Sequence, residues 1–277
     1  MPFIFSQWEK FCTGLKNAGI ISVQPSFLLK EKPLSRFLVL KHDVETDPSK
    51  ALIMAKIENT HGHRGVYYVQ AYLLGSEKNI DILKKIQSLG HEVSYHHDVM
   101  DQCKGDILKA ADEFEKNADK FRKCGFTVST VCQHGNPVIE RKGYTSNRDL
   151  FRDGVTAERF RGISEIMVNF RNRINADYKY ISDAGYGWKI IFDPENNDVV
   201  PSSDKDVPLD SFDDVLKAAG DNSVIISTHP HRWHENAVKA FVKDTTFRII
   251  RTSAKTAIKI PGMKRLMGRF YYIAKKI

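Results

Sequence analysis

Acidic residues and histidines cluster where apolar runs end in this sequence. The first cluster follows the run at 36–40 and consists of His42, Asp43 and Glu45. Later runs end in further histidines, namely His96, His97, His134, His229 and His231. Carboxylates and imidazoles that leave open coordination positions suit a catalytic divalent metal. The residue types therefore predict one divalent ion, with zinc as the expected metal.

Such a site needs a scaffold that brings the ends of several strands together. Strand-like apolar runs occur at 37–41, 65–70, 90–98, 127–132, 178–183 and 222–227. Helical patterns lie at 6–19, 47–62, 79–89, 105–123 and 209–219. This alternation predicts βαβ units and a parallel sheet. Because the carboxyl ends of parallel strands converge on one mouth, we expect the clusters to meet there.

The composition predicts a soluble protein with an ordinary core. The chain has 277 residues, 42% of them hydrophobic, which is enough for one large domain or two small ones. Its four cysteines form no Cys-x-x-Cys pair, so we expect free thiols in a reducing compartment. The segment 1–5 lacks the features of a signal peptide, and no run has transmembrane length. We therefore expect a cytoplasmic location.

Positive charge is concentrated at the carboxyl end of the chain. Residues 239–277 contain eleven Lys or Arg and a single acid, a net +10, whereas the whole chain carries +8. The preceding part is therefore close to neutral. A nucleic-acid-binding domain carries its basic surface on the folded body, so this distribution argues against a nucleic-acid partner.

Three motifs in order, LKHDVE at 40–45, GHEVSYHHD at 90–98 and STHPHRW at 227–233, resemble those of the polysaccharide deacetylases. The similarity is greatest to divergent members linked to surface polysaccharides such as lipopolysaccharide O-antigen. It implies a distorted (β/α) barrel of seven or eight strands with its site at the carboxyl ends. It also implies removal of N-acetyl or related acyl groups from a sugar or surface-glycan precursor. We accordingly expect a lead-in at 1–34, a barrel at 35–235 and a basic helical tail at 236–277.

The resemblance implies a general base and a metal ligand in the first motif. If the motif is Asp-x-acid, Asp43 is the base and Glu45 the ligand. If the two positions are adjacent, His42 stands at the base position and Asp43 is the ligand. We favour the first interpretation because an imidazole does not replace a carboxylate at similar reach.

The second motif departs from the family pattern. His96 matches the first of two metal-binding histidines, but the second position is occupied by Met100. His97, His134, His229 and His231 are candidates for the missing ligand. Strand alternation points His97 away from His96, so we favour His134.

The resemblance also assigns the remaining site residues. His229 matches the general acid of the last motif, and Asp183 and Trp188 resemble residues that support the catalytic pair and line the sugar site. We further expect His97 and His231 to contact the substrate.

Two other functions are compatible with the sequence. The chain could hydrolyse a different C–N bond, such as a cyclic amide, with a similar site. It could also be a degenerate, non-catalytic glycan-binding protein, which the methionine at position 100 favours. Metal content would separate the latter from an enzyme.

The tail suggests a contact with a membrane surface. After Pro261 and Gly262 it can form a helix with basic flanks. Its apolar stripe consists of Met263, Leu266, Met267, Phe270 and Ile273 or Ala274. Such a helix is typical of an anionic membrane interface. The alternative is a terminal helix packed on the barrel.

Overall fold

The computed structural model describes residues 3–31, 35–136, 139–185, 187–200, 203–242 and 245, so the predicted tail stripe lies outside it. Within these residues, nine strands form one sheet in the order β5-β4-β3-β2-β1-β9-β6-β7-β8. Their bounds are β1 Leu38–Val44, β2 Gly65–Val69, β3 Glu92–His97, β4 Thr130–Gln133, β5 Ser164–Glu165, β6 Lys179–Ser182, β7 Trp188–Ile191, β8 Val207–Leu209 and β9 Val224–Thr228.

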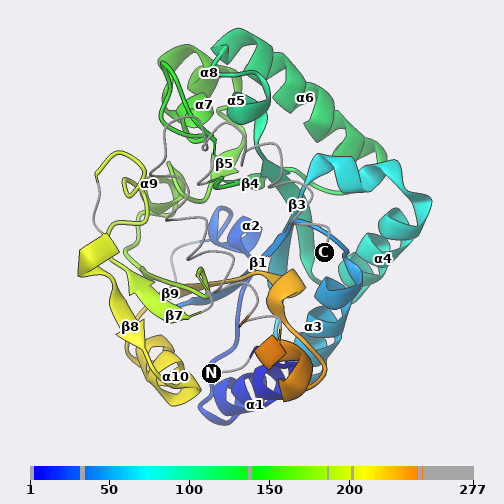
Figure 1. The fold of residues 1–277 in the computed structure, drawn as a ribbon, viewed down its shortest axis with the longest axis vertical. Coiled ribbons are helices and arrows are strands. Elements are labelled where there is room, and N and C mark those ends of the chain that lie inside the picture. Colours follow the sequence, from blue (N-terminus) through cyan, green and yellow to red (C-terminus); the bar gives the residue numbers. More distant parts are fainter. Residues whose placement is uncertain are drawn as a thin grey trace.

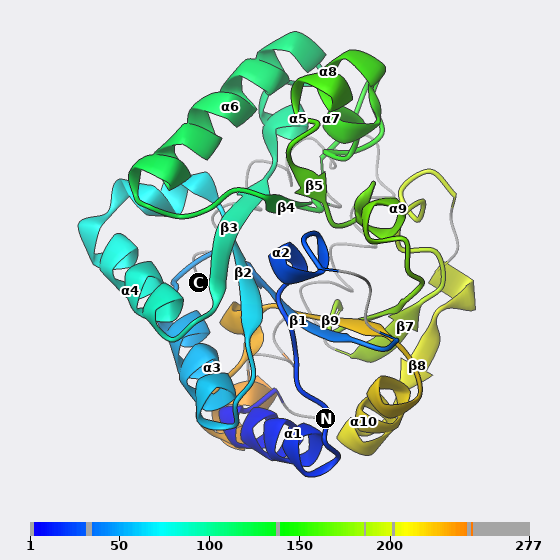
Figure 2. The same cartoon turned by 180° about the vertical axis from the view of Figure 1, so that it is seen from behind.

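Helices occupy the connections and surround the sheet (Figure 1). The α-helices are α1 Phe5–Asn17, α2 Pro25–Leu28, α3 Ser49–Thr60, α4 Glu77–Ser88, α5 Val99–Gln102, α6 Ile107–Lys123, α7 Asp149–Arg152, α8 Gly154–Arg159, α9 Phe170–Ile174 and α10 Phe212–Asp221. Short 3-10 turns are η1 Ala71–Gly75, η2 Ser203–Lys205 and η3 Pro230–Arg232. Figure 2 shows α2 inside the curve of the sheet, and α1, α3, α4, α6 and α10 around the outside.

The sheet is parallel from β5 to β6 and antiparallel beyond it. The predicted α/β class with a parallel sheet is therefore confirmed. A closed barrel of seven or eight strands is not found, because the edge strands β5 and β8 do not pair with each other in the described part of the chain. The hairpins that join β6, β7 and β8 extend the sheet at the end opposite to β5.

Alternation along each strand gives the sheet two different faces. On β1, Val39 belongs to an inner apolar core with Leu28 of α2 and Phe170 of α9. Leu38 and Leu40 face outward and pack with Trp8 of α1. Lys41 and Asp43 therefore point inward, and His42 points outward between the sheet and the helices.

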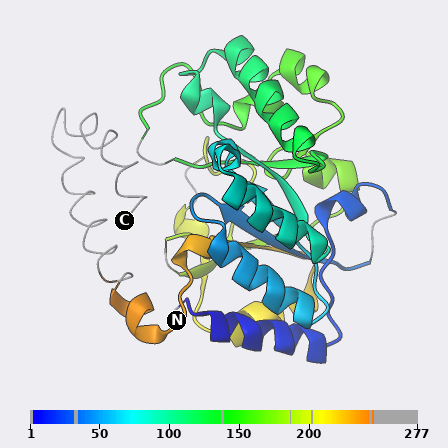
Figure 3. The same cartoon turned by 90° about the vertical axis from the view of Figure 1, so that its right-hand side faces the viewer.

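The amino-terminal segment is packed into the same unit as the sheet. Trp8 is fully buried, and isolated parallel bridges join Ile4 to His234 and Ser22 to Leu38. Figure 3 shows α1, α3 and α4 on one side of the molecule, with α3 between the other two. No helix within the described ranges has the length and apolar content needed to cross a membrane.

Candidate active site

Five polar side chains meet at the carboxyl ends of the inner strands. They come from β1 and the residue after it, from β3, and from the residues that follow β4 and β9, and they are Asp43, Glu45, His96, His134 and His229. They lie far apart in the sequence, and the parallel sheet brings them to one edge. All five were predicted as site residues, and the structure places them within a few ångströms of one another.

The imidazole of His96 has the orientation of a metal ligand. Its Nδ1 lies 3.0 Å from the carbonyl oxygen of Cys132, which can only accept, so Nδ1 carries the proton. Its Nε2 therefore holds a lone pair, and this buried atom has no hydrogen-bond partner among the described residues. Burial lowers the pKa of His96 to about 3, which keeps the ring neutral. A carbonyl that fixes the tautomer in this way is the usual support for a metal-binding histidine.

Glu45 and His134 complete a set of three ligands with His96. Glu45 Oε1 lies 3.4 Å from His134 Nε2, and the ligand atoms of all three residues lie within 4.8 Å of one another. Ligands about 2.0–2.2 Å from a tetrahedral ion are roughly 3–4 Å apart. The donor set and its spacing therefore fit one divalent ion, with one position open as in catalytic zinc sites.

The carboxylate of Asp43 forms an ion pair with the buried ammonium group of Lys41. Lys41 Nζ lies 2.7 and 2.6 Å from the two carboxylate oxygens and 3.1 Å from the Ser227 hydroxyl oxygen. Burial alone would raise the pKa of Asp43, but the combined attraction of Lys41, His96 and His229 outweighs it and lowers that pKa. Burial would likewise lower the pKa of Lys41, and Asp43 raises it. Asp43 is therefore ionised, with both oxygens already engaged by a cation.

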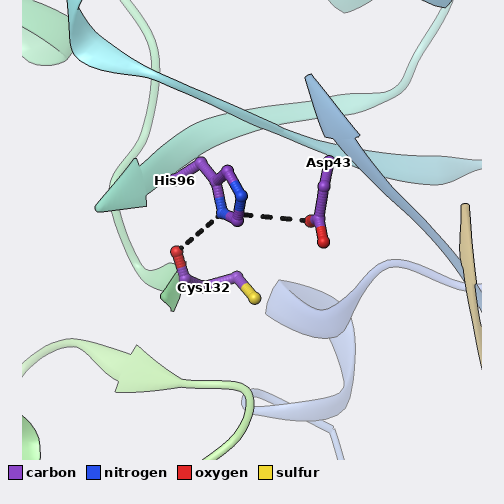
Figure 4. Close-up of side chains that lie close together, drawn as sticks. All are labelled: Asp43, His96 and Cys132. Carbon is purple, nitrogen blue, oxygen red and sulfur yellow. Dashed lines mark hydrogen bonds and ion pairs between the residues drawn. The ribbon is translucent and has the colours of Figure 1, made fainter. Parts of the chain in front are cut away.

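A second group of potential ligands contains Asp43, His96 and Cys132, shown in Figure 4. Burial raises the pKa of the Cys132 thiol well above its usual value, so the thiolate that binds metals is disfavoured. In addition, the Lys41 ammonium occupies the Asp43 carboxylate and would repel a dication there. The group of Glu45, His96 and His134 is therefore the better candidate for the ion.

His229 is oriented by a buried carboxylate. Its Nδ1 lies 2.5 Å from Asp183 Oδ1, and its backbone N–H donates to Asp183 Oδ2 at 3.0 Å. Burial would raise the pKa of Asp183, but the attraction of His229 and Arg232 outweighs it and holds that pKa at about 2. The other ring nitrogen, Nε2, faces the site and lies 3.9 Å from Asp43 Oδ2 and 4.0 Å from Glu45 Oε1. Asp183 thus supports His229 from behind the site.

Other predicted site residues do not reach this cluster. His97 points to the outer face, where its ring packs on Phe114 and Phe151. Trp188 is 3% exposed and packs on Phe3 in the outer aromatic core. These positions do not support a contact with substrate for either residue, because the sheet separates the outer face from the inner one.

The remaining predicted positions lie beside the cluster or behind it. The His231 ring is 5.9 Å from that of His229, on the half-buried turn η3. His42, the alternative base, faces outward, so Asp43 and Glu45 are the acidic pair on the inner side. Met100, which belongs to α5, is buried in an apolar core.

The sequence-based prediction did not include Lys41. A signal was present, because Lys41 stands two residues before Asp43 and strand alternation places both side chains on the same face. Tyr72 was also missed. It is 61% exposed, and its hydroxyl donates to the Glu45 carbonyl oxygen at 2.6 Å. An exposed ring in η1 gave no pattern that could be recognised in the sequence.

Comparisons with known proteins identify no family. No protein-family model and no curated protein matches the sequence. Among solved structures, the chain is similar to the peptidoglycan deacetylase PdaC from Bacillus subtilis, in its D285S mutant form. The two share 10% sequence identity over 80% of this chain and 99% of that one, with a TM-score of 0.36. A score at this level does not establish a common fold.

Proposed function

We propose that this protein is a metal-dependent hydrolase that removes N-acetyl or related acyl groups from a sugar or surface-glycan precursor. The observation that carries the proposal is the meeting of two sets of groups on one side of the sheet. Glu45, His96 and His134 form a ligand set with a free His96 lone pair, and an ionised Asp43 and an oriented His229 face it. The sugar as substrate rests on the motif resemblance alone.

Each residue has a role in the hydrolysis of an amide. When bound, a divalent ion supplies a Lewis acid that polarises the carbonyl and acidifies water. Asp43, kept ionised by Lys41, accepts a proton from the attacking water. His229 donates a proton from Nε2 to the leaving amine, while Asp183 accepts the Nδ1–H and holds the ring in place. These are the groups that cleavage of a linear amide needs.

Acetate release tests the proposal directly. Zinc-loaded protein is incubated with N-acetylhexosamine oligosaccharides, a nucleotide-linked N-acetylhexosamine and a lipid-linked one. We expect release of acetate from at least one class, loss of release on chelation, and loss in Asp43→Asn. An enzyme that holds its ion but releases no acetate from any class would refute the proposal.

A non-catalytic glycan-binding protein is the second candidate, and Met100 favours it. Met100 occupies the position of the second metal-binding histidine in the motif resemblance, and it is buried in an apolar core. This candidate predicts sugar binding without stoichiometric metal and without turnover. A hydrolase of another C–N bond would keep metal and turnover but act on a cyclic amide.

A further inference from the structure

A second polar cluster lies behind the site, on the outer face of β1. At its centre is Glu58 of α3, which is 0% exposed. Its carboxylate accepts from Trp8 Nε1 at 3.0 Å and from the Tyr67 hydroxyl at 2.9 Å. His42 Nε2 lies 2.9 Å from the Glu58 Oε1 atom, an ion-pair contact whose angles are not those of a hydrogen bond. Burying a carboxylate is costly unless its oxygens are satisfied, and here both are.

His42 connects this carboxylate to the neighbouring strand. Its Nδ1 bonds to the Thr228 hydroxyl at 2.6 Å, so Glu58, His42 and Thr228 form one continuous chain of contacts. His42 and Thr228 are also the last register partners between β1 and β9. Each is followed directly by a residue of the proposed catalytic pair, Asp43 after His42 and His229 after Thr228.

The surroundings leave this chain little freedom to move. The Gly65 N–H donates to His91 Nδ1 at 2.9 Å, and His91 Nε2 lies 2.9 Å from the Ala55 carbonyl oxygen. A Cβ at Gly65 would come within 2.9 Å of Glu58 Oε2 and 3.2 Å of His42 Nε2. The His42 ring also stacks on Tyr67, with centroids 4.3 Å apart.

We propose that Glu58, His42 and Thr228 form a positioning relay that sets the separation of Asp43 and His229. Backbone pairing of β1 with β9 ends at His42 and Thr228, so the side-chain link at this last pair fixes how the two strand ends diverge. Asp43 Oδ2 and His229 Nε2 are 3.9 Å apart, a gap in which a shift of about 1 Å can cost about 100-fold in rate. The relay contacts no substrate, and its catalytic effect rests on the proposed function.

The test compares Thr228→Val, which removes the hydroxyl but keeps the shape, with Thr228→Ser, which keeps the hydroxyl. Thr156→Val is the matched control, because Thr156 of α8 is also buried and its hydroxyl donates to the Leu150 carbonyl oxygen, outside the chain of Glu58, His42 and Thr228. We expect Thr228→Val to lower kcat about 10- to 100-fold with KM and metal content unchanged. Thr228→Ser and Thr156→Val should keep kcat within about threefold, although Thr156→Val loses a buried hydrogen bond of its own.

A second readout does not depend on turnover. In metal-free protein with 15N-labelled histidine, the Nδ1–H of His229 bonded to Asp183 should give a slowly exchanging, downfield NMR signal. We expect Thr228→Val to shift or broaden this signal and Thr228→Ser to keep it. If Thr228→Val does not fold, Glu58→Gln breaks the same chain and is measured in its place.

The outcomes separate the relay from the proposed function. An unchanged His229 signal together with wild-type kcat in a folded Thr228→Val protein would refute the relay and leave the hydrolase intact. A shifted signal in a protein that turns over no substrate would support the relay as a structural device and refute the hydrolase.

Discussion

Residue environment assigns different roles to two carboxylates that stand two positions apart. Asp43 faces an ammonium group that engages both of its oxygens, whereas Glu45 faces His134 and the free lone pair of His96. Lys41 therefore favours Asp43 as the base and leaves Glu45 as the metal ligand. If the two carboxylates exchanged environments, they would exchange functions, because ionisation and metal coordination depend on the groups that each carboxylate faces.

Lys41→Met tests this separation. It leaves the Asp43 carboxylate buried without its cation, and breaking one side of a buried pair typically costs about 3–5 kcal/mol. We expect a lower free energy of unfolding in urea, by an amount of that order. The double variant Lys41→Met with Asp43→Asn removes both partners and should recover part of the loss. Wild-type stability in the single variant would show that the pair is not formed in solution.

His97→Leu tests the placement of His97 outside the site. Both ring nitrogens of His97 are buried and lack a hydrogen-bond partner among the described residues. Burial lowers its pKa to about 3, so the unfolded chain binds a proton below about pH 6.5 and the folded chain does not. Stability is therefore lost as pH falls from 6.5 towards 3.

We expect His97→Leu to retain its metal and activity and to lose less stability on acidification than wild type, by an amount on the order of a few kcal/mol. Acid unfolding of metal-free protein followed by circular dichroism measures this difference. The neighbouring variant His96→Leu is the control for metal loss. Loss of metal in His97→Leu would place His97 back in the site.

The residues that meet at the site were predictable from the sequence, but the buried ion pair between Asp43 and Lys41 was not. The position of each candidate after an apolar run was enough to bring Asp43, His96 and His229 to one edge. Lys41 was overlooked because the sequence does not show which face of the strand is closed to water. Trp188 was placed wrongly because an aromatic residue near Asp183 reads the same whether it packs inward or outward.

At the scale of elements, the regular βα units were predicted, whereas the open, antiparallel end of the sheet was not. The strands expected at 37–41, 65–70 and 222–227 correspond to β1, β2 and β9 within a few residues. Strong apolar runs and helical periodicity identify such elements without tertiary context. The two-residue β5 and the hairpin strands β7 and β8 are too short to show a periodic pattern in the sequence.

The short edge strand β5 carries a buried acid, Glu165, that makes the stability of the fold depend on pH. Glu165 accepts backbone N–H groups from Gln133 at 2.8 Å and Met167 at 2.6 Å. Burial raises its pKa to about 7, from an ordinary value of 4.5. Between these values the folded state binds more protons than the unfolded state, so stability falls as pH rises.

Glu165→Gln should flatten this dependence. We expect wild-type protein to lose on the order of 3 kcal/mol between pH 4.5 and 7 from this residue, and the variant to lack that contribution. Urea unfolding at several pH values gives the slope of the free energy of unfolding against pH for each protein. These slopes can be compared even if the variant is less stable overall. Equal slopes in the two proteins would show that Glu165 is ionised in the fold.

At the scale of the whole molecule, the near-neutral body and the basic tail are distinct. Val238 and Phe241, in the helical residues 237–242 at the start of this tail, are 73% and 70% exposed. The sequence predicts that this segment continues as an apolar stripe flanked by Lys and Arg, which suits an anionic lipid surface.

Co-sedimentation with anionic liposomes tests the predicted membrane contact. We expect binding at low salt, weaker binding at high salt because the attraction is screened, and loss of binding when residues 261–277 are deleted. Neutral liposomes are the control. No sedimentation at low salt, or sedimentation that the deletion does not change, would assign the tail to the folded body.

The most direct test of the account is the metal content of protein purified without a histidine tag, measured by mass spectrometry of the elements. The site of Glu45, His96 and His134 predicts about one divalent ion per chain in wild type. Glu45→Gln and His96→Ala should lose that ion, and Asp43→Asn should keep it while losing activity. A wild type without stoichiometric metal, or a His96→Ala protein that retains it, would contradict the account.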